Sequence, residues 1–226
     1  MKKTILIAFL IISKTILFAQ ETPKIKATVW DSGVHAKTIY KIDGLEEKLA
    51  NHKTIAILPF KVSILYNNPP KNLDPQTTKD EEKRMSFDLQ SSMCSYLSNS
   101  KDYYKVQIQN EDTTDILLNE HNMMNNPENY TPEEIAKVLG VDAVVYCTYT
   151  YTKVGSNLEA IGVQLLVGLH HSKVATGELT MDIYNGADGE LLWAFNKIMN
   201  QEALTSPESI IRRMMSKVER NFPYKK

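Results

Sequence analysis

Residues 131–151 read TPEEIAKVLGVDAVVYCTYTY and contain a short helix joined directly to a strand. Thr131 stands where a helix N-cap is expected, Pro132 suits the first helical position, and Glu134 completes a capping box. Gly140 supplies the left-handed residue that commonly follows a helix. The residues after it are rich in β-branched and aromatic side chains, which favours a strand. The stretch therefore predicts a tight αβ unit within a sheet that carries helices.

Further strands are expected on both sides of this unit. TIAILPF, residues 54–60, is apolar on both faces and predicts a strand covered on both sides that ends at Pro59. Apolar and polar side chains alternate over 104–109, as in a half-buried strand. Residues 178–184 and 190–195 flank the turn sequence NGADG, so they are expected to form a hairpin.

Helices are expected between and after these strands. Residues 79–98 place their apolar side chains on one face, and Asp112 is a candidate N-cap for a second helix. Ser206 precedes Pro207 at the start of a terminal helix. The order of elements predicts an α/β (α+β) fold: a single mixed β-sheet with helices packed on it.

The first twenty residues resemble a secretory signal peptide. Lys2 and Lys3 precede the apolar run ILIAFLII (5–12), and Ala19 and Gln20 offer a processing point. An uncleaved anchor is the alternative, but Lys14 interrupts the run well before the roughly 20 residues that a spanning helix needs. Cleavage near Ala19/Gln20, a location in the periplasm or outside the cell, and no transmembrane span in the mature chain are expected.

The expected division is a signal peptide (1–20), an amino-terminal arm (21–52) and an α/β domain (53–226). Within the arm, a short strand at 25–30 and a short helix at 44–52 are possible readings. Three of the 26 basic side chains lie in residues 1–20, so 23 remain against 27 acidic ones, a formal charge of −4. This balance, without a basic block, argues against a nucleic-acid partner.

Two features stay open at this stage. Residues 156–171 fit a helix that begins with a capping box at Ser156 and Glu159, which we favour, but they also fit an apolar strand with a period of two. Cys94 and Cys147 are expected to be small buried hydrophobic side chains, although an oxidising compartment would permit a disulfide between them.

No catalytic motif is recognised in the sequence. There is no nucleophile elbow, phosphate-binding loop or zinc-protease motif. His170 and His171 form the only adjacent histidine pair, which we interpret as solvated rather than metal-binding. Glu133 and Glu134 are explained by helix capping, and Asp142 by a hydrogen-bonded turn. We therefore predict no catalytic, cofactor-binding or metal-binding residues, and no cofactor.

The two tryptophans receive different interpretations. Trp193 in the hairpin is expected to lie in the core. Trp30 is expected to fold back on the domain, with an exposed contact to a partner as the alternative, because aromatic side chains often anchor interfaces.

Three segments in order give the chain a family resemblance. They are LPF at 58–60, LGVDAVVY at 139–146 and DIYNGADGELLW at 182–193. Their order and spacing resemble the envelope α/β domain shared by the curli-secretion lipoprotein CsgG, the LpoB-type activators of penicillin-binding proteins and the amino-terminal domain of TolB. The resemblance covers about residues 54–220. It implies that 139–145 joins a helix to a central strand and that 188–190 forms the turn before the last strand.

The chain also departs from these families. It lacks the acylated cysteine of CsgG, residues 152–176 are too few for two long transmembrane hairpins, and nothing remains for the propeller of TolB. The resemblance therefore implies the fold and the compartment, and a domain that binds proteins without catalysing a reaction.

The leading hypothesis is an exported, non-catalytic envelope protein-binding or assembly module that uses sheet edges or the amino-terminal arm. An envelope protein partner is expected, of unknown identity, and the oligomeric state stays open. The alternative is a small-molecule or lipid carrier that uses the apolar segment 158–169. An enzyme would require separated residues to assemble a site that the sequence does not reveal.

Overall fold

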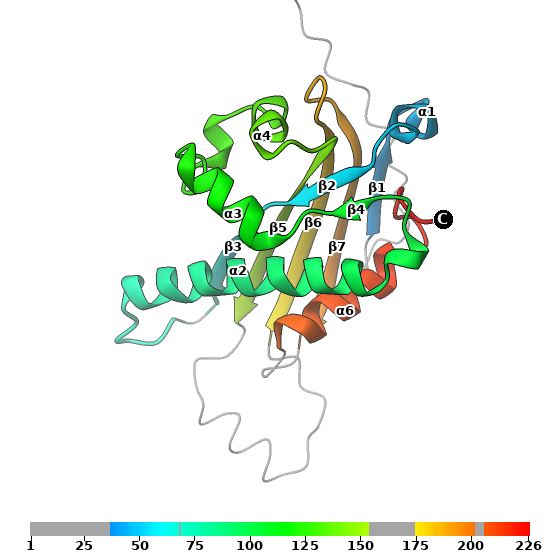
Figure 1. Ribbon diagram of the computed structural model, residues 1–226. Helices are drawn as coiled ribbons and strands as arrows, with labels where there is room; N and C mark the ends of the chain where they lie inside the picture. The colour runs from blue at the N-terminus through cyan, green and yellow to red at the C-terminus, as the bar shows by residue number, and fades with distance from the viewer. Residues whose placement is uncertain (1–36, 68, 154–174, 202–205) are drawn as a thin grey trace, which may run out of the picture.

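The computed structural model describes residues 37–67, 69–153, 175–201 and 206–226. These residues form one mixed sheet of seven strands with helices packed on it, so the predicted fold class is confirmed. The sheet order is β1-β7-β6-β5-β2-β4, and β3 pairs with the second half of β5 (Figure 1). The strands are β1 Lys37–Lys41, β2 Thr54–Ile57, β3 Lys61–Tyr66, β4 Gln107–Ile108, β5 Ala143–Lys153, β6 Ala175–Asn185 and β7 Leu191–Gln201.

The pairs β5–β6, β6–β7 and β7–β1 are antiparallel, whereas β2 and β3 run parallel to β5 and β4 runs parallel to β2. The described α-helices are α1 Leu45–Leu49, α2 Pro75–Asn99, α3 Glu111–Glu120, α4 Pro132–Leu139 and α6 Pro207–Val218. Short 3-10 turns lie at Lys101–Tyr103 and Pro127–Asn129.

The larger core lies between one face of the sheet and helices α2 and α6, which lie side by side (Figure 1). Alternate β5 residues, among them Val145, Cys147 and Tyr149, point into this core because side chains alternate along a strand. The apolar face of α6 is buried as predicted, through Ile210, Ile211, Met214, Met215 and Val218.

A smaller core lies on the opposite face, where α3 and α4 cover the start of β2 and β5. Ala56, Leu58 and Val144 belong to it, so the expectation that residues 54–60 are covered on both faces is confirmed. Beyond Tyr146 and Tyr184, which meet edge to face at 5.3 Å, the side chains on this face are mainly polar and partly exposed.

The predicted αβ junction forms in full. Thr131 accepts a hydrogen bond from the Glu134 N–H, and the Glu134 carboxylate accepts one from the Thr131 N–H. Gly140 takes φ 67° and ψ 38°, the left-handed conformation that ends α4. The predicted hairpin and the Ser206 N-cap are also confirmed, with β6 and β7 longer than expected.

Several boundaries differ from the sequence expectations. Helix α3 begins after Asn110, whose side chain accepts from the Thr113 N–H, so the expectation that Asp112 is the N-cap was wrong. The strand expected at 104–109 is reduced to β4, because only its last residues reach β2. Strand β3 was not predicted, and helix α2 begins at Pro75, four residues earlier than expected.

Part of the range 21–52 lies within the sheet. Strand β1 pairs with β7 along its whole length, and α1 buries Leu45 and Leu49 in the larger core. Trp193 is buried as predicted, and Cys94 and Cys147 are both buried and free. The expectations for residues 1–20, Trp30, 156–171 and the pair His170–His171 fall outside the described residues.

We predict that Gly186→Ala destabilises the domain, because this residue brings the β6–β7 turn against the α4–β5 junction. A Cβ at Gly186 would lie 2.8 Å from the Ala136 Cβ and 2.8 Å from the carbonyl oxygen of Asp142. Such overpacking typically costs about 1–3 kcal/mol. Urea unfolding measures the loss, and the exposed neighbour Ala187→Ser is the control. Equal stability of the two variants would contradict this account of the junction.

Candidate binding site

Within the described residues, strand β1 lies at an edge of the sheet and pairs only with β7. Its register with β7 runs from Lys37 opposite Lys197 to Lys41 opposite Trp193, and the Ile42 N–H donates to the Leu192 carbonyl at 3.1 Å. In an antiparallel ladder, alternate residues exchange hydrogen bonds with the partner strand. The next residues to do so are those at 40 and 38. The backbone groups at 37, 39 and 41 therefore point away from β7.

The outward groups of β1 have no backbone partner within the described part of the chain. The side chains of these same residues, Lys37, Ile39 and Lys41, share one face of the sheet, because backbone direction and side-chain direction alternate together along a strand. That face is the one on which Trp193 lies, since Lys41 is opposite it in the register. The free edge and this face therefore present the same three residues.

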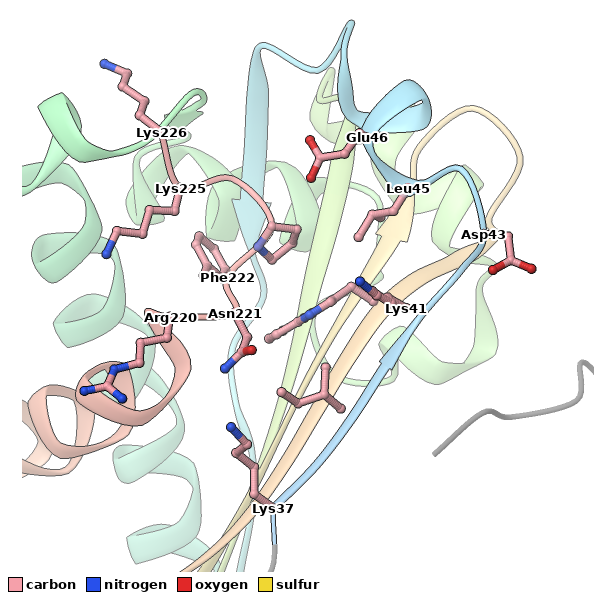
Figure 2. A pocket seen from close by; sticks show the side chains of 13 residues that line it. Lys37, Lys41, Asp43, Leu45, Glu46, Arg220, Asn221, Phe222, Lys225 and Lys226 are labelled. Atoms are coloured by element: carbon pink, nitrogen blue, oxygen red, sulfur yellow. The ribbon is translucent and has the colours of Figure 1, made fainter. Parts of the chain in front are cut away.

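A cavity of about 700 Å³ opens on this face (Figure 2). One wall is β1, a second is the segment 43–46 at the start of α1, and a third is the tail that follows α6. Its apolar surface includes Trp193 and Phe222, whose rings meet edge to face at 6.1 Å. Trp193 is 1% exposed and Phe222 4%, so both rings are fixed within the core.

Positive charge predominates around the cavity. The lining contains five basic side chains, Lys37, Lys41, Arg220, Lys225 and Lys226, and two acidic ones, Asp43 and Glu46. Lys225 pairs with Glu219 at 3.2 Å, and Glu46 pairs with Lys105 at 3.6 Å. The other four cations form no side-chain ion pair within the described ranges. The cavity is thus cationic in a chain whose formal net charge is −1.

The tail wall is held in place by backbone hydrogen bonds. The Lys105 N–H donates to the Tyr224 carbonyl at 2.8 Å, and the Lys226 N–H donates to the Tyr103 carbonyl at 2.9 Å. Tyr104 and Phe222 also pack edge to face at 5.5 Å. These contacts fix the third wall relative to the sheet, so the cavity is preformed.

A polar network supports the sheet near this site. The Asp142 carboxylate accepts from the N–H groups of Lys53 and Thr54 at 2.7 and 2.8 Å. Partial burial pushes the pKa of Asp142 up, but these donors outweigh it and leave the pKa below its usual value. Asp142 is therefore the hydrogen-bonded turn carboxylate that was predicted. His52 lies 2.8 Å from the Tyr224 hydroxyl, and burial lowers the pKa of His52.

A second ionic cluster fixes the β6–β7 turn to α1. Lys48 reaches Asp188 at 3.2 Å and Glu190 at 2.9 Å, and the Asn185 amide donates to Asp188 at 2.7 Å. Each of these groups has a partner within the fold, which identifies the cluster as a structural support. Within the described residues, no three His, Cys, Asp or Glu side chains are arranged to hold a metal ion.

A smaller cavity of about 510 Å³ lies where β2 continues into β3. Its polar groups serve the fold: Glu82 accepts from the Ile64 N–H at 2.7 Å, and the Ser86 hydroxyl donates to the Phe60 carbonyl at 2.6 Å. Its lining contains three lysines and two glutamates, so its excess of positive charge is smaller than that of the cavity beside β1. We therefore take the cavity beside β1 as the candidate site.

This site was not predicted from the sequence. Trp193 was correctly expected to lie in the core, but the sequence does not indicate that it also lines a cavity. The signal that could have found the strand is the run of β-branched and aromatic residues Thr38, Ile39 and Tyr40. The sequence does not indicate that the basic residues of the tail lie at the same cavity as β1, because nearly 180 residues separate them from that strand.

Comparison with solved structures finds matches of low identity. The crystal structure of lipoprotein GNA1162 from Neisseria meningitidis is 13% identical and covers 75% of this chain and 95% of its own, with a TM-score of 0.44. The LpoB C-terminal domain from Salmonella enterica is 12% identical over 70% of this chain and 93% of its own, with a TM-score of 0.33. A PelC dodecamer from Paraburkholderia phytofirmans is 13% identical over 84% and 97%, with a TM-score of 0.39.

LpoB C-terminal domains, which belong to the family predicted from the sequence to be similar, are thus among the matching structures. No protein-family model and no curated protein matches the chain. None of the described helices is both long enough and apolar enough to cross a membrane.

We predict that Asp182→Asn stabilises the protein near neutral pH. Asp182 lies opposite Tyr146 in β6, and burial raises its pKa to about 6. The folded state therefore favours the protonated acid, so stability falls as the pH rises from about 4 through 6. The partly exposed position limits the gain from the amide to about 1 kcal/mol at pH 7.5.

Chemical denaturation at pH 4 and pH 7.5 measures this effect. The gain should be absent at pH 4, where the wild-type acid is protonated. Glu178→Gln, an exposed acid on the same face of β6, is the control. A gain of the same size at both pH values would show that charge burial at Asp182 is not its cause.

Proposed function

We propose that this chain is an exported, non-catalytic protein-binding module of the bacterial cell envelope, which binds its partner through the β1 edge. The observation that supports this proposal is the row of outward backbone groups at Lys37, Ile39 and Lys41 beside a preformed cavity. An exposed edge is a template for an added strand, and several peptide-binding domains use this mode of recognition.

The other edges of the sheet are protected. Strand β4 is only two residues long, which gives little length for pairing. The outer edge of β3 is occupied at its middle, because the Ile64 N–H donates to the Glu82 carboxylate. Natural proteins use short strands and local caps of this kind to avoid unwanted pairing. The contrast with β1 supports a binding role for that edge.

The carrier alternative rests on residues 158–169, which lie outside the described residues, and no other observation favours it. The polar clusters near the sheet ends have structural partners, as shown above. Binding without catalysis is therefore the function that the contacts of this chain support best.

The proposed export has its own test. The processed chain is expected in the periplasmic or external fraction, with an amino terminus near Gln20 or Glu21, because residues 1–20 match a signal peptide. Cell fractionation followed by amino-terminal sequencing measures both. A full-length precursor found only in the cytosol would refute the proposed compartment.

We predict that Ile39→Pro abolishes partner binding. Proline removes the outward N–H of this position, and an edge strand tolerates it because β7 does not use that group. Ile39→Ala is the matched control, since it also shortens the side chain but keeps the N–H. Pull-down from a detergent-solubilised envelope, read by quantitative mass spectrometry, should show partners with wild type and with Ile39→Ala only.

Thr38→Pro tests the register at a residue whose N–H points toward β7 instead of outward. The N–H of Thr38 faces β7, so its loss should lower the melting temperature, whereas Ile39→Pro should lower it no more than Ile39→Ala does. Partners that bind Ile39→Pro as well as wild type, or a wild-type chain that captures none, would count against binding through β1.

A further inference from the structure

We infer that the segment added to β1 carries two acidic side chains, spaced four residues apart, with an apolar side chain midway between them. This inference rests on the proposed function and specifies the chemistry of its partner. It follows from the charge and register of the edge, and from the half-buried Ile39 between its two lysines.

The geometry of strand addition defines which partner residues matter. An added strand lies about 4.8 Å from β1, and residues directly opposite each other in the pair point to the same face. The partner residues opposite Lys37, Ile39 and Lys41 would therefore lie on the cavity side (Figure 2). They are every second residue of the partner, so the pattern has the form acidic–x–apolar–x–acidic.

The charges of Lys37 and Lys41 determine which side chains are expected at the outer two positions of the partner. Lys37 and Lys41 form no ion pair within the described ranges, and opposite charges across a strand pair stabilise it by about 0.2–1 kcal/mol each. Arg220 and Lys226 on the tail, which also form no side-chain ion pair within the described ranges, add further positive charge at the same cavity. A basic partner would instead meet like charge at every one of these positions.

The apolar side chain of Ile39 determines which side chain is expected at the middle position of the partner. Ile39 is half-buried between the two lysines, and Trp193 and Phe222 lie on the same cavity surface. An apolar side chain opposite Ile39 would remove the exposed part of the Ile39 side chain from water, which stabilises the complex by about 25 cal/mol for each Å² buried.

A second copy of this chain is a poor occupant of the edge. Antiparallel pairing of two β1 strands about Ile39 would place Lys37 of one copy opposite Lys41 of the other. Like charges directly opposite each other destabilise a strand pair. The charge pattern of β1 therefore disfavours self-association and favours an acidic partner.

Three fluorescent peptides test the inference against the processed chain. The first is acetyl-Ser-Glu-Thr-Leu-Thr-Glu-Ser-amide, which has the inferred pattern. The second replaces both glutamates by lysine. The third, acetyl-Ser-Thr-Glu-Leu-Glu-Thr-Ser-amide, has the composition of the first but moves both acids to the opposite face of the strand. Fluorescence anisotropy should show the first binding about tenfold more tightly than the other two, a preference that weakens with added salt.

Charge reversal gives the matched protein variants. The double variant Lys37→Glu and Lys41→Glu should reverse the preference and bind the lysine peptide more tightly. Lys71→Glu, at an exposed position outside the cavity, should leave the preference of the wild-type chain unchanged. Amide NMR shifts caused by the first peptide should concentrate at Lys37, Ile39 and Lys41.

The remaining outcomes separate this inference from the proposed function. Equal binding of all three peptides, lost in Ile39→Pro, would overturn the acidic pattern and leave edge binding intact. No peptide binding, with envelope partners still lost in Ile39→Pro, would overturn the pattern in the same way. A dimer dissociated by Ile39→Pro would assign the edge to a second copy. Binding to phosphatidylglycerol vesicles but to no peptide would assign the cations to lipid headgroups.

Discussion

The fold depends on strand β5, whose side chains belong to both hydrophobic cores. Its odd-numbered residues enter the core under α2 and α6, and Val144 enters the core under α3 and α4. β5 also pairs with β6 along one side and with both β2 and β3 along the other. The side-chain period of two imposes this arrangement, since a slip of one residue would exchange the contents of the two cores. The capping box and Gly140 fix where the strand begins, and therefore its register.

Local sequence signals predicted the structure correctly at positions that only a few residue types can occupy. Thr131, Gly140 and Ser206 were placed correctly because caps and left-handed positions have few suitable residues. Asn110 was missed because Asp112 is an equally good cap, and the choice depends on where the preceding strand leaves β2. β3 was missed because the interruption at Pro59 reads as the end of a strand. In the structure one extra residue is accommodated there, and pairing with β5 resumes.

The candidate site could not be predicted because it depends on contacts between distant segments. Lys37 and Lys41 belong to an edge strand whose only strand partner in the described residues, β7, follows some 150 residues later. Arg220 and Lys226 reach the cavity because backbone hydrogen bonds fix the tail against residues 103–105. No window of sequence contains both groups. The general prediction that a sheet edge provides the binding surface needed only the fold class, whereas the choice of edge needed the full topology.

The open edge and the cavity contribute differently to binding. A backbone hydrogen bond between β1 and a partner would replace hydrogen bonds to water, so each would contribute only about 0.5–1.5 kcal/mol. Any extended segment could form these bonds, which orient the partner without selecting it. Selection must come from side chains, and in the proposed binding mode the accessible groups that would supply it are Lys37, Ile39 and Lys41. Because the tail holds the cavity in place before binding, little conformational entropy is lost there when a partner enters. In the proposed binding mode, the edge would therefore orient the partner and the side chains beside the cavity would select it.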